Sequence, residues 1–347
     1  MQINLSQRTI HFKKPARTSR GEYTEHQMVL ITITDDEGRR IGLGECAPLP
    51  DLSCDRDAYT HLSDVAALIR QAMDSEDYAE FLRPYPALLF ALESAMYDYQ
   101  QNPLLYDTPF ARSEVGIPIN GLVWMAGYDE MFAEMKRKLL QGFHCIKLKI
   151  GAISWDDEIR LIEKIRSRFS PDNLELRVDA NGGFTFDEAK EKLAQLNKYA
   201  IHSIEQPIKQ YQWNEMAELC RGAEAGEYPR IALDEELIGV NQLLEKQKLL
   251  DVIRPQFVVV KPTLHGGISG AIEWISEACK RGIGSWLTSA LESNVGLRNV
   301  ALLAARVYDV GRQPVMPQGL GTGMLFTDNI EMDVEMRGNK LWRCEVE

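Results

Sequence analysis

Three carboxylate residues, each at the end of a short apolar run, are spaced in the way that most directly suggests a metal-binding or catalytic site. They are Asp179 in LELRVDANGG, Glu205 in IHSIEQP and Asp234 in RIALDEE. The intervals of 26 and 29 residues are close to the length of one strand–helix unit in a parallel barrel. Because the carboxyl ends of successive barrel strands meet at one mouth, we expect the three side chains to converge there.

Three like charges in a small volume raise one another's pKa and destabilise a fold unless a cation lies between them. Carboxylate oxygens suit a hard divalent cation, so we expect Asp179, Glu205 and Asp234 to bind Mg²⁺, with Mn²⁺ as the alternative ion. The alternative for any one of them is a helix cap or a pair with a local arginine. The regular spacing of all three favours the metal site.

Lys147 and Lys149 alternate in KLK, so both side chains lie on one strand face. If that face lines the barrel mouth, the two ammonium groups lower each other's pKa, and one approaches the range of a general base. The alternative is an exposed edge strand with solvated lysines. Lys261 ends the run QFVVVK and is expected to enter the same mouth from the opposite side, unless it forms only a salt bridge with a nearby carboxylate.

These groups together suggest proton removal beside a carboxylate. A metal would hold the substrate carboxylate and stabilise the enediolate that forms, while a lysine takes the proton. An anionic substrate needs such a locally positive pocket, because the chain as a whole carries a net charge of −12.

Further polar residues near the strand ends are candidates for substrate binding. Asn181 either orders the metal site or supports the Asn-Gly-Gly turn. Arg177 shares the strand face of Asp179 and either holds a substrate carboxylate or forms a structural ion pair, which we favour slightly. Ser289 and Ser293 follow the seventh predicted strand, where hydroxyls and backbone amides often hold anions.

A strand–helix alternation from about residue 116 would position these side chains. The segments between its strands suit amphipathic helices, most clearly 156–169 and 186–199. Eight strands with helical crossovers predict a barrel, and the loop-rich residues 319–347 indicate that its last helix is absent or displaced. The candidate strands are 117–122, 145–150, 174–179, 201–205, 230–234, 256–261, 284–288 and 314–318.

The first 112 residues have a different pattern, which predicts an α+β domain. Residues 28–34 are typical of a strand, 35–38 of a turn and 39–47 of a return strand, so together they predict a hairpin. Residues 86–101 have helical character, and residues 103–115 are predicted to be a linker.

Composition narrows the class of protein further. With 347 residues, 45% of them hydrophobic, the chain is expected to be globular and soluble, and its acidity argues against nucleic acid or an anionic membrane as a partner. Six cysteines without a CxxC pair, and an N-terminus without a signal-peptide core, predict a reducing cytoplasm. No phosphate-binding glycine motif or GxSxG element occurs, no two histidines have the spacing of metal ligands, and the oligomeric state is left undetermined.

The motifs KLK, RVDAN, SIEQP, LDEE and VVKP, in this order and spacing, resemble the enolase superfamily, and the two-lysine arrangement is similar to its muconate-lactonizing subgroup. The resemblance covers nearly the whole chain and implies an α/β fold, a modified TIM barrel of the type (β/α)7β with an N-terminal α+β capping domain. It implies a capping domain at 1–112, a barrel at 113–320 and a C-terminal segment at 321–347 that returns to the capping domain.

Within the subgroup, GLGECAPLPDLS, KPTLHGG and SALESNVG are most similar to the o-succinylbenzoate synthase family of menaquinone biosynthesis. This resemblance implies a carbon–oxygen lyase that uses Mg²⁺ to dehydrate a small cyclohexadiene carboxylate. It implies that Lys149 removes the α-proton and then protonates the departing hydroxyl, that Lys261 stabilises the anionic intermediate, and that Lys147 lies against the substrate. Specificity would reside in the capping loops near 16–26 and 48–54.

Two departures and three alternatives accompany this resemblance. Glu236 follows Glu235 where a small residue is usual, and PQGLGTG lacks the Asp-x-Asp pair of the dipeptide epimerases. An N-acylamino acid racemase or dipeptide epimerase would use the same metal but needs both lysines to exchange protons, whereas a syn elimination needs one. A binding protein on a retired barrel would have lost a ligand or a lysine, and a Schiff-base aldolase would leave the three acids without a purpose.

Overall fold

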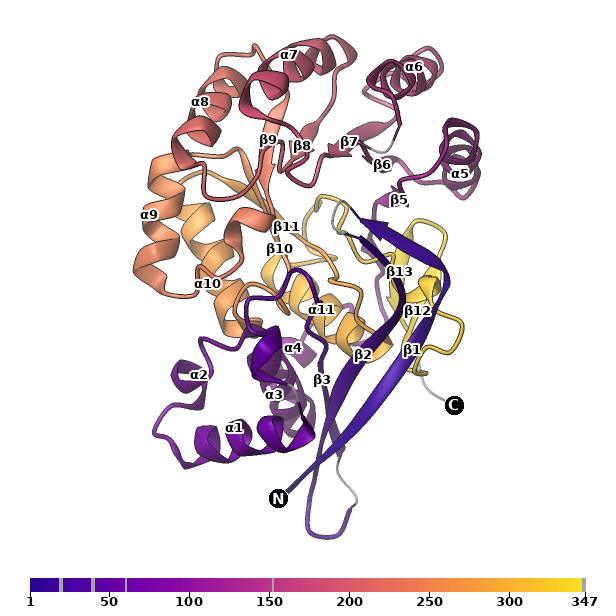
Figure 1. The fold of residues 1–347 in the computed structure, drawn as a ribbon. Coiled ribbons are helices and arrows are strands. Elements are labelled where there is room, and N and C mark those ends of the chain that lie inside the picture. Colours follow the sequence, from indigo (N-terminus) through magenta and orange to yellow (C-terminus); the bar gives the residue numbers. More distant parts are fainter. Residues whose placement is uncertain (19–20, 39–40, 60, 152, 345–347) are drawn as a thin grey trace.

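The computed structural model shows a curled parallel sheet that is surrounded by helices (Figure 1). A separate antiparallel sheet lies beside it. The structure describes residues 1–18, 21–38, 41–59, 61–151 and 153–344. The parallel sheet has seven strands in the order β11-β10-β9-β8-β7-β6-β5. They are β5 (Gly121–Val123), β6 (Cys145–Lys149), β7 (Glu175–Asp179), β8 (Ser203–Glu205), β9 (Arg230–Leu233), β10 (Phe257–Val260) and β11 (Gly284–Leu287).

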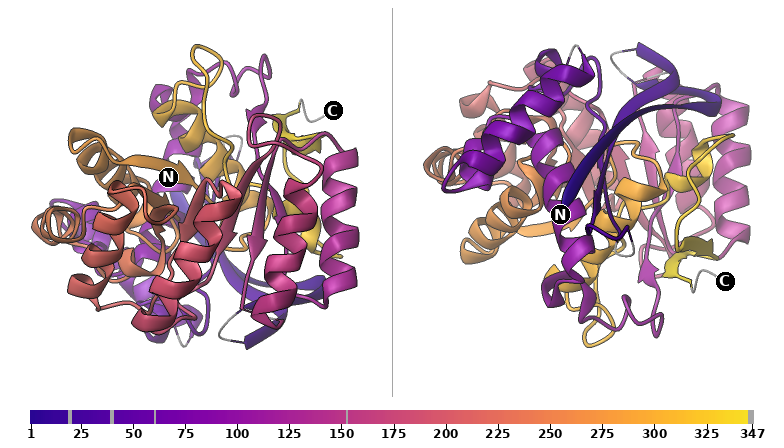
Figure 2. Two further views of the ribbon diagram at one scale, coloured as in Figure 1. Left: turned by 90° about the horizontal axis from the view of Figure 1, so that it is seen from above. Right: turned by 90° about the horizontal axis from the view of Figure 1, so that it is seen from below.

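Each of these strands is followed by a helix on the outside of the sheet, and Figure 2 shows the outer helices side by side around it. The strands are short and almost wholly buried, as expected for parallel strands covered on both faces. The two helices predicted most clearly from the sequence, 156–169 and 186–199, are both present. The seven helices are α5 (Tyr128–Leu140), α6 (Trp155–Arg166), α7 (Phe186–Leu196), α8 (Trp213–Glu224), α9 (Leu243–Ile253), α10 (Gly267–Lys280) and α11 (Asn294–Val307).

A short closing segment, residues 317–319, joins the two edges of the parallel sheet. The Gln318 amide donates to the Pro118 carbonyl at 2.8 Å, and the Gly319 amide donates to the Leu287 carbonyl at 2.8 Å. The closing segment therefore takes the place of an eighth strand. No eighth outer helix follows within the described residues, only the 3-10 turn Gly323–Leu325 and a hairpin, so the predicted (β/α)7β barrel is confirmed.

Two of the predicted strands differ from those observed. Residues 314–318 form only an isolated bridge, because Pro314 and Pro317 lack the amide protons that a regular ladder needs. The predicted strand 117–122 is divided into β4 (Ile117–Pro118) and β5. β4 pairs with β13 (Lys340–Arg343), which pairs with β12 (Val334–Arg337), so the chain enters the barrel beside its own C-terminal hairpin.

The N-terminal residues form the antiparallel sheet β1-β2-β3, with α1 (Leu62–Asp74), α2 (Tyr78–Phe81), α3 (Pro86–Gln100) and α4 (Pro103–Tyr106). The predicted hairpin is confirmed, since Val29 pairs with Cys46, although Arg39 and Arg40 lie outside the described residues. The predicted helix is α3, whereas α4 lies within the predicted linker and β1 was not predicted. The strands are β1 (Gln2–Thr18), β2 (Gly21–Thr34) and β3 (Ile41–Cys46).

Two buried carboxylates connect the N-terminal elements to the barrel. Glu93 of α3 accepts a hydrogen bond from the Ile268 amide at 2.5 Å, and Glu45 of β3 accepts from the amides of Ser293 and Gly296, each at 2.9 Å. Burial raises the pKa of both carboxyl groups to about 7. Because a helix N-terminus carries unpaired amide protons, these side chains cap α10 and α11 and orient the N-terminal elements on the barrel mouth.

The C-terminal segment contacts β1 as well as β4. The ring of Phe326 lies 4.5 Å from that of Phe12, and the Thr327 amide donates to the His11 carbonyl at 2.8 Å. The domain boundaries at residues 112 and 320 stay a prediction, and residues 345–347 lie outside the described part of the chain. No described helix has both the length and the apolar character required to span a membrane.

We expect Gly44→Ala to destabilise the protein by about 2 kcal/mol, the cost of overpacking a close contact. A Cβ atom at Gly44 would lie 1.8 Å from the Ala91 carbonyl oxygen, so β3 would have to separate from α3. Urea unfolding measures the change. Gly127→Ala is the control, because a Cβ there meets nothing within 4 Å, and an equal midpoint for the two variants would contradict the close packing.

Candidate active site

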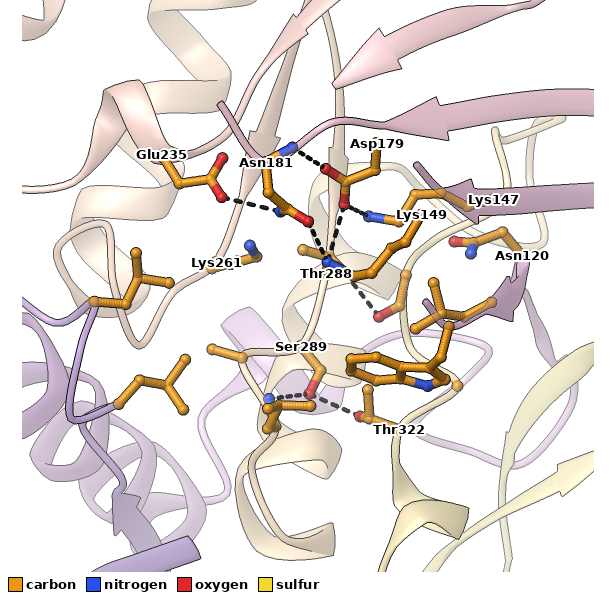
Figure 3. A pocket seen from close by; sticks show the side chains of 18 of the residues that line it. Asn120, Lys147, Lys149, Asp179, Asn181, Glu235, Lys261, Thr288, Ser289 and Thr322 are labelled. Carbon is orange, nitrogen blue, oxygen red and sulfur yellow. Dashed lines mark hydrogen bonds and ion pairs between the residues drawn. The ribbon is translucent and has the colours of Figure 1, made fainter. Parts of the chain in front are cut away.

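The strand register brings the predicted chemical groups to one edge of the barrel, as expected. Lys149 pairs with Asp179, and Asp179 pairs with Glu205, so these three residues lie side by side on β6, β7 and β8. Asp234 directly follows β9 and Lys261 directly follows β10. Figure 3 shows Lys149 and Lys261 entering the pocket from opposite sides of the view.

Both lysines of β6 bind the acids next to them. The Lys147 Nζ lies 3.1 Å from Asp179 Oδ2 and 3.0 Å from each Glu205 carboxylate oxygen. The Lys149 Nζ lies 3.3 Å from Asp179 Oδ2 and donates to Asn181 Oδ1 at 2.7 Å. Neither lysine is solvated on an exposed edge, because each retains only 8% of its accessible surface.

Lys261 forms an ion pair with Asp234, as the salt-bridge alternative supposed, and also lines the pocket. Its backbone amide donates to the Nδ1 of the buried His265 at 2.9 Å, which holds the start of the following turn. The lysine therefore combines a buried carboxylate partner with access to the pocket.

Charge and burial act in opposite directions on these groups. Burial opposes ionisation of Asp179, but the charges of Lys147 and Lys149 outweigh it and hold the pKa of Asp179 well below its usual range. Burial raises the pKa of Glu205 to about 8, and the charge of Asp179 contributes to that increase. Burial also raises the pKa of Asp234.

The expectation that the paired lysines lower each other's pKa is wrong for Lys147. Burial does lower the pKa of its ammonium group, but the charges of Asp179, Glu205 and Asp234 outweigh burial and raise it. The acids prevail because several of them surround this ammonium group, two of them in direct contact.

Acidic oxygens at this site have the chemistry of a site for a hard cation. In the part of the chain that the structure describes, no three Asp, Glu, His or Cys side chains are arranged to hold an ion as they stand. Lys147 instead bridges Asp179 and Glu205. However, Asp234 Oδ1 and Glu235 Oε2 are buried without a hydrogen-bond partner among the described residues, and an ion that displaced the ammonium group would find carboxylates from three successive strands.

Glu235 is a site residue that sequence reasoning missed, although its position directly after Asp234 was a usable signal. It lines the pocket and accepts from Asn181 Nδ2 at 3.0 Å. Glu236 is neither a spare ligand nor a surface charge, since it is buried and accepts from Gln206 Nε2 at 3.2 Å. Gln206 Oε1 in turn accepts from the amides of Asp234 and Glu236, which ties the ends of β8 and β9 together.

Arg177 does not line the pocket, so its assignment to substrate binding is corrected. Its guanidinium donates to Glu175 at 2.6 Å and to the Pro317 carbonyl at 3.0 Å, and lies 4.2 Å from the centre of the Trp286 ring. Two residues before Asp179 on the same strand, Arg177 shares its face but lies one layer deeper in the barrel. The structural ion pair that we favoured is present.

The two serines differ in their roles. Ser289 lines the pocket, but its hydroxyl donates to Glu292 Oε2 at 2.5 Å and accepts from Thr322 Oγ1 at 2.7 Å. Ser293 caps α11, and its hydroxyl donates to Glu45. Ser293 therefore caps a helix, and its hydroxyl is not available for the predicted binding of an anion.

The pocket has a charged half and a largely neutral half. The charged half contains the three lysines with Asp179, Asn181 and Glu235, and the neutral half includes Thr288 and Ser289. Leu49 and Leu52 reach it from the predicted capping loop 48–54. Tyr23 also lines it, but from β2, because most of the predicted loop 16–26 belongs to β1 and β2; residues 19–20 lie outside the described part. Sequence reasoning missed the remaining lining residues, namely Asn120, Leu122, Trp124, Ala290, Leu291, Gly319, Gly321 and Thr322.

Comparisons with known proteins agree with this geometry. The profile of the family described as Enolase C-terminal domain-like matches residues 130–331. The o-succinylbenzoate synthase of Desulfotalea psychrophila (strain LSv54 / DSM 12343) is 40% identical over 98% of each chain. The crystal structure of MenC from D. psychrophila LSv54 aligns with a TM-score of 0.81 and 37% identity over 99% of each chain. The L-Ala-D/L-Glu epimerase of Bacillus subtilis (strain 168) is 26% identical over 90% of this chain and 86% of that one.

We expect the affinity for a divalent cation to increase as the pH rises from 6.5 to 8.5. The pKa of Glu205 is raised to about 8, so below that pH a proton competes with the ion for this carboxylate. Release of one proton would change the affinity by up to about tenfold per pH unit. Calorimetric titration with MgCl₂ at both pH values measures it, and equal affinities would contradict the prediction that Glu205 is a ligand.

Proposed function

Because the chain belongs to the enolase superfamily, we propose that it is an o-succinylbenzoate synthase, a hydro-lyase. The proposed reaction is the syn dehydration of 2-succinyl-6-hydroxy-2,4-cyclohexadiene-1-carboxylate to o-succinylbenzoate in menaquinone biosynthesis. Two lysines that enter one pocket beside a cluster of buried carboxylates carry the proposal, since this is the arrangement that proton removal next to a carboxylate requires.

Lys149 is the proposed acid and base. Its ammonium group is oriented by Asn181 Oδ1 and lies 5.7 Å from the centre of the Trp124 ring. As the free amine, it takes the proton from the ring carbon that bears the carboxylate, and the electron pair moves into an enediolate. The resulting ammonium then protonates the departing hydroxyl on the same face, the C–O bond breaks, and water leaves as the ring becomes aromatic.

Lys261 is proposed to stabilise the anionic intermediate from the other side of the pocket by its charge, and Lys147 to lie against the substrate. Members of this superfamily generally use a divalent metal, and we propose Mg²⁺, with Mn²⁺ as the alternative, held by Asp179, Glu205 and Asp234. When bound, the ion supplies positive charge to the substrate carboxylate and so stabilises the enediolate.

The alternative on the same scaffold is an N-acylamino acid racemase or a dipeptide epimerase. Access of both Lys149 and Lys261 to the pocket is the observation that favours it, because racemisation needs a proton donor on each face. The Asp-x-Asp pair that grips a substrate ammonium in the epimerases has no counterpart here, since Gly319 and Gly321 line the pocket at the end of the closing segment. This difference supports a substrate without an α-ammonium group.

A reducing cytoplasm is the proposed location of the enzyme. All six cysteines are free thiols in the structure, and Cys54 and Cys279 are exposed without a partner for a disulfide. Free exposed thiols are typical of proteins in compartments that keep cysteine reduced.

The purified protein is expected to consume the cyclohexadiene substrate rapidly in the presence of Mg²⁺, with loss of the diene absorbance. Addition of EDTA should abolish the change, and a restored excess of Mg²⁺ should recover it. An absorbance that does not change with enzyme and metal would contradict the dehydratase proposal. The next substrates would then be N-succinylamino acids and dipeptides, tested by deuterium exchange at the α-carbon.

Lys149→Ala should lower kcat by at least about 10³-fold, the scale of general acid–base catalysis, while Mg²⁺ binding is retained. Lys261→Ala should lower kcat less, because the charge of Lys261 stabilises an intermediate and transfers no proton. The exposed Lys198→Ala is the matched control and should retain full turnover. Turnover by the Lys149 variant at the control rate would overturn the assignment of the base.

A further inference from the structure

Asn120 is a buried amide in the pocket wall whose side chain has no hydrogen-bond partner among the described residues. The residue lies between β4 and β5 and retains 5% of its accessible surface. Its backbone is held, since the amide donates to the Gln318 carbonyl of the closing segment at 3.0 Å. Figure 3 shows its side-chain amide turned toward the centre of the pocket.

Strand alternation explains the direction of this side chain. Asn120, Leu122 and Trp124 occupy every second position and all line the pocket. Leu122 pairs with Lys147 on the neighbouring strand, which places Asn120 two residues before the level of that lysine. The backbone therefore orients the carboxamide into the pocket without help from a side-chain bond.

The hydroxyl groups in the neutral half of the pocket are already engaged. Thr288 donates to the Gly319 carbonyl at 3.0 Å, Thr322 donates to Ser289, and Ser289 donates to Glu292. A hydroxyl has one proton, so none of the three can donate to a ligand without losing its present bond. The Asn120 amide has two N–H groups that make no bond to another described residue, so it can donate to a ligand without losing one.

Packing alone does not account for an amide at this position. Leucine has nearly the same size and would fill the same space. The polar atoms of the Asn120 side chain are not fully enclosed by protein, so they remain accessible from the pocket. A ligand oxygen that accepted from the amide would replace water there when it bound.

We propose that Asn120 positions the substrate by donating a hydrogen bond to an oxygen of its succinyl arm, an inference that rests on the proposed dehydratase function. The ring carboxylate belongs in the charged half beside the lysines and Asp179. The succinyl arm is attached to the adjacent ring carbon, so it extends toward the neutral half, where Asn120 supplies the donor. Asn120 is thus a specificity-determining residue and takes no part in proton transfer.

Steady-state dehydration kinetics, thermal unfolding and Mg²⁺ titration of three variants test this assignment. Asn120→Leu should raise KM by about tenfold, the effect of one lost hydrogen bond, with little change in kcat, an unchanged Mg²⁺ affinity and an unchanged Tm. Asn120→Asp should raise KM further, because a carboxylate repels the arm's oxygens. Asn173→Leu, the same change at an exposed site before β7, is the control and should match the unchanged protein.

A wild-type KM for Asn120→Leu would overturn the assignment, because it would show that the amide makes no hydrogen bond to the substrate. A wild-type KM for Asn120→Asp would also overturn it, because it would show that the side chain accepts a hydrogen bond and does not donate one. A fall in Tm with an unchanged KM would show a structural role and overturn it equally. If the unchanged protein does not dehydrate the diene, the dehydratase proposal itself fails. If it does and the Asn120 variants match it, only the present inference fails.

Discussion

The whole site depends on the mutual neutralisation of buried charges at the carboxyl ends of β6 to β10. Lys147 lies between Asp179 and Glu205, Lys149 contacts Asp179, and Lys261 contacts Asp234. No one of these groups would tolerate burial by itself, because desolvation disfavours every charged form. The lysines therefore occupy positions around the acids that the proposed divalent ion would take, and binding of that ion would free ammonium groups to face a substrate.

The rest of the fold places these charges accurately and covers them. Parallel pairing aligns Lys149, Asp179 and Glu205 in one register, and Gln206 fixes the turn that carries Asp234. The N-terminal elements are fixed to the same edge, because Glu45 and Glu93 cap the two helices that follow β10 and β11. Leu49 and Leu52 of the N-terminal part line the pocket with apolar side chains, which limits the access of water to it.

Much of this architecture could be predicted because it depends on local pattern. Apolar runs that end in an acid or a lysine marked the strand ends, and the length of the intervals marked the crossover helices. Strand alternation predicted that Arg177 and Asp179 share a face, but it does not say how deep in the barrel each side chain lies. Arg177 therefore stacks on Trp286 below the pocket.

Contacts between distant segments were harder to predict. The availability of the Ser289 hydroxyl depends on Glu292 and Thr322, and the pKa of Lys147 depends on acids from three other strands. Asn120 was missed because the predicted strand 117–122 does not say which of its two faces lines the pocket, and only the closed barrel shows that its amide does.

A crystal structure with Mg²⁺ and o-succinylbenzoate would test the central claim most directly. The account predicts one ion bound by Asp179, Glu205 and Asp234, with Lys147 no longer bridging the first two, and with Lys149 and Lys261 on opposite faces of the product ring. An ion bound elsewhere, with Lys147 still between Asp179 and Glu205, would contradict it.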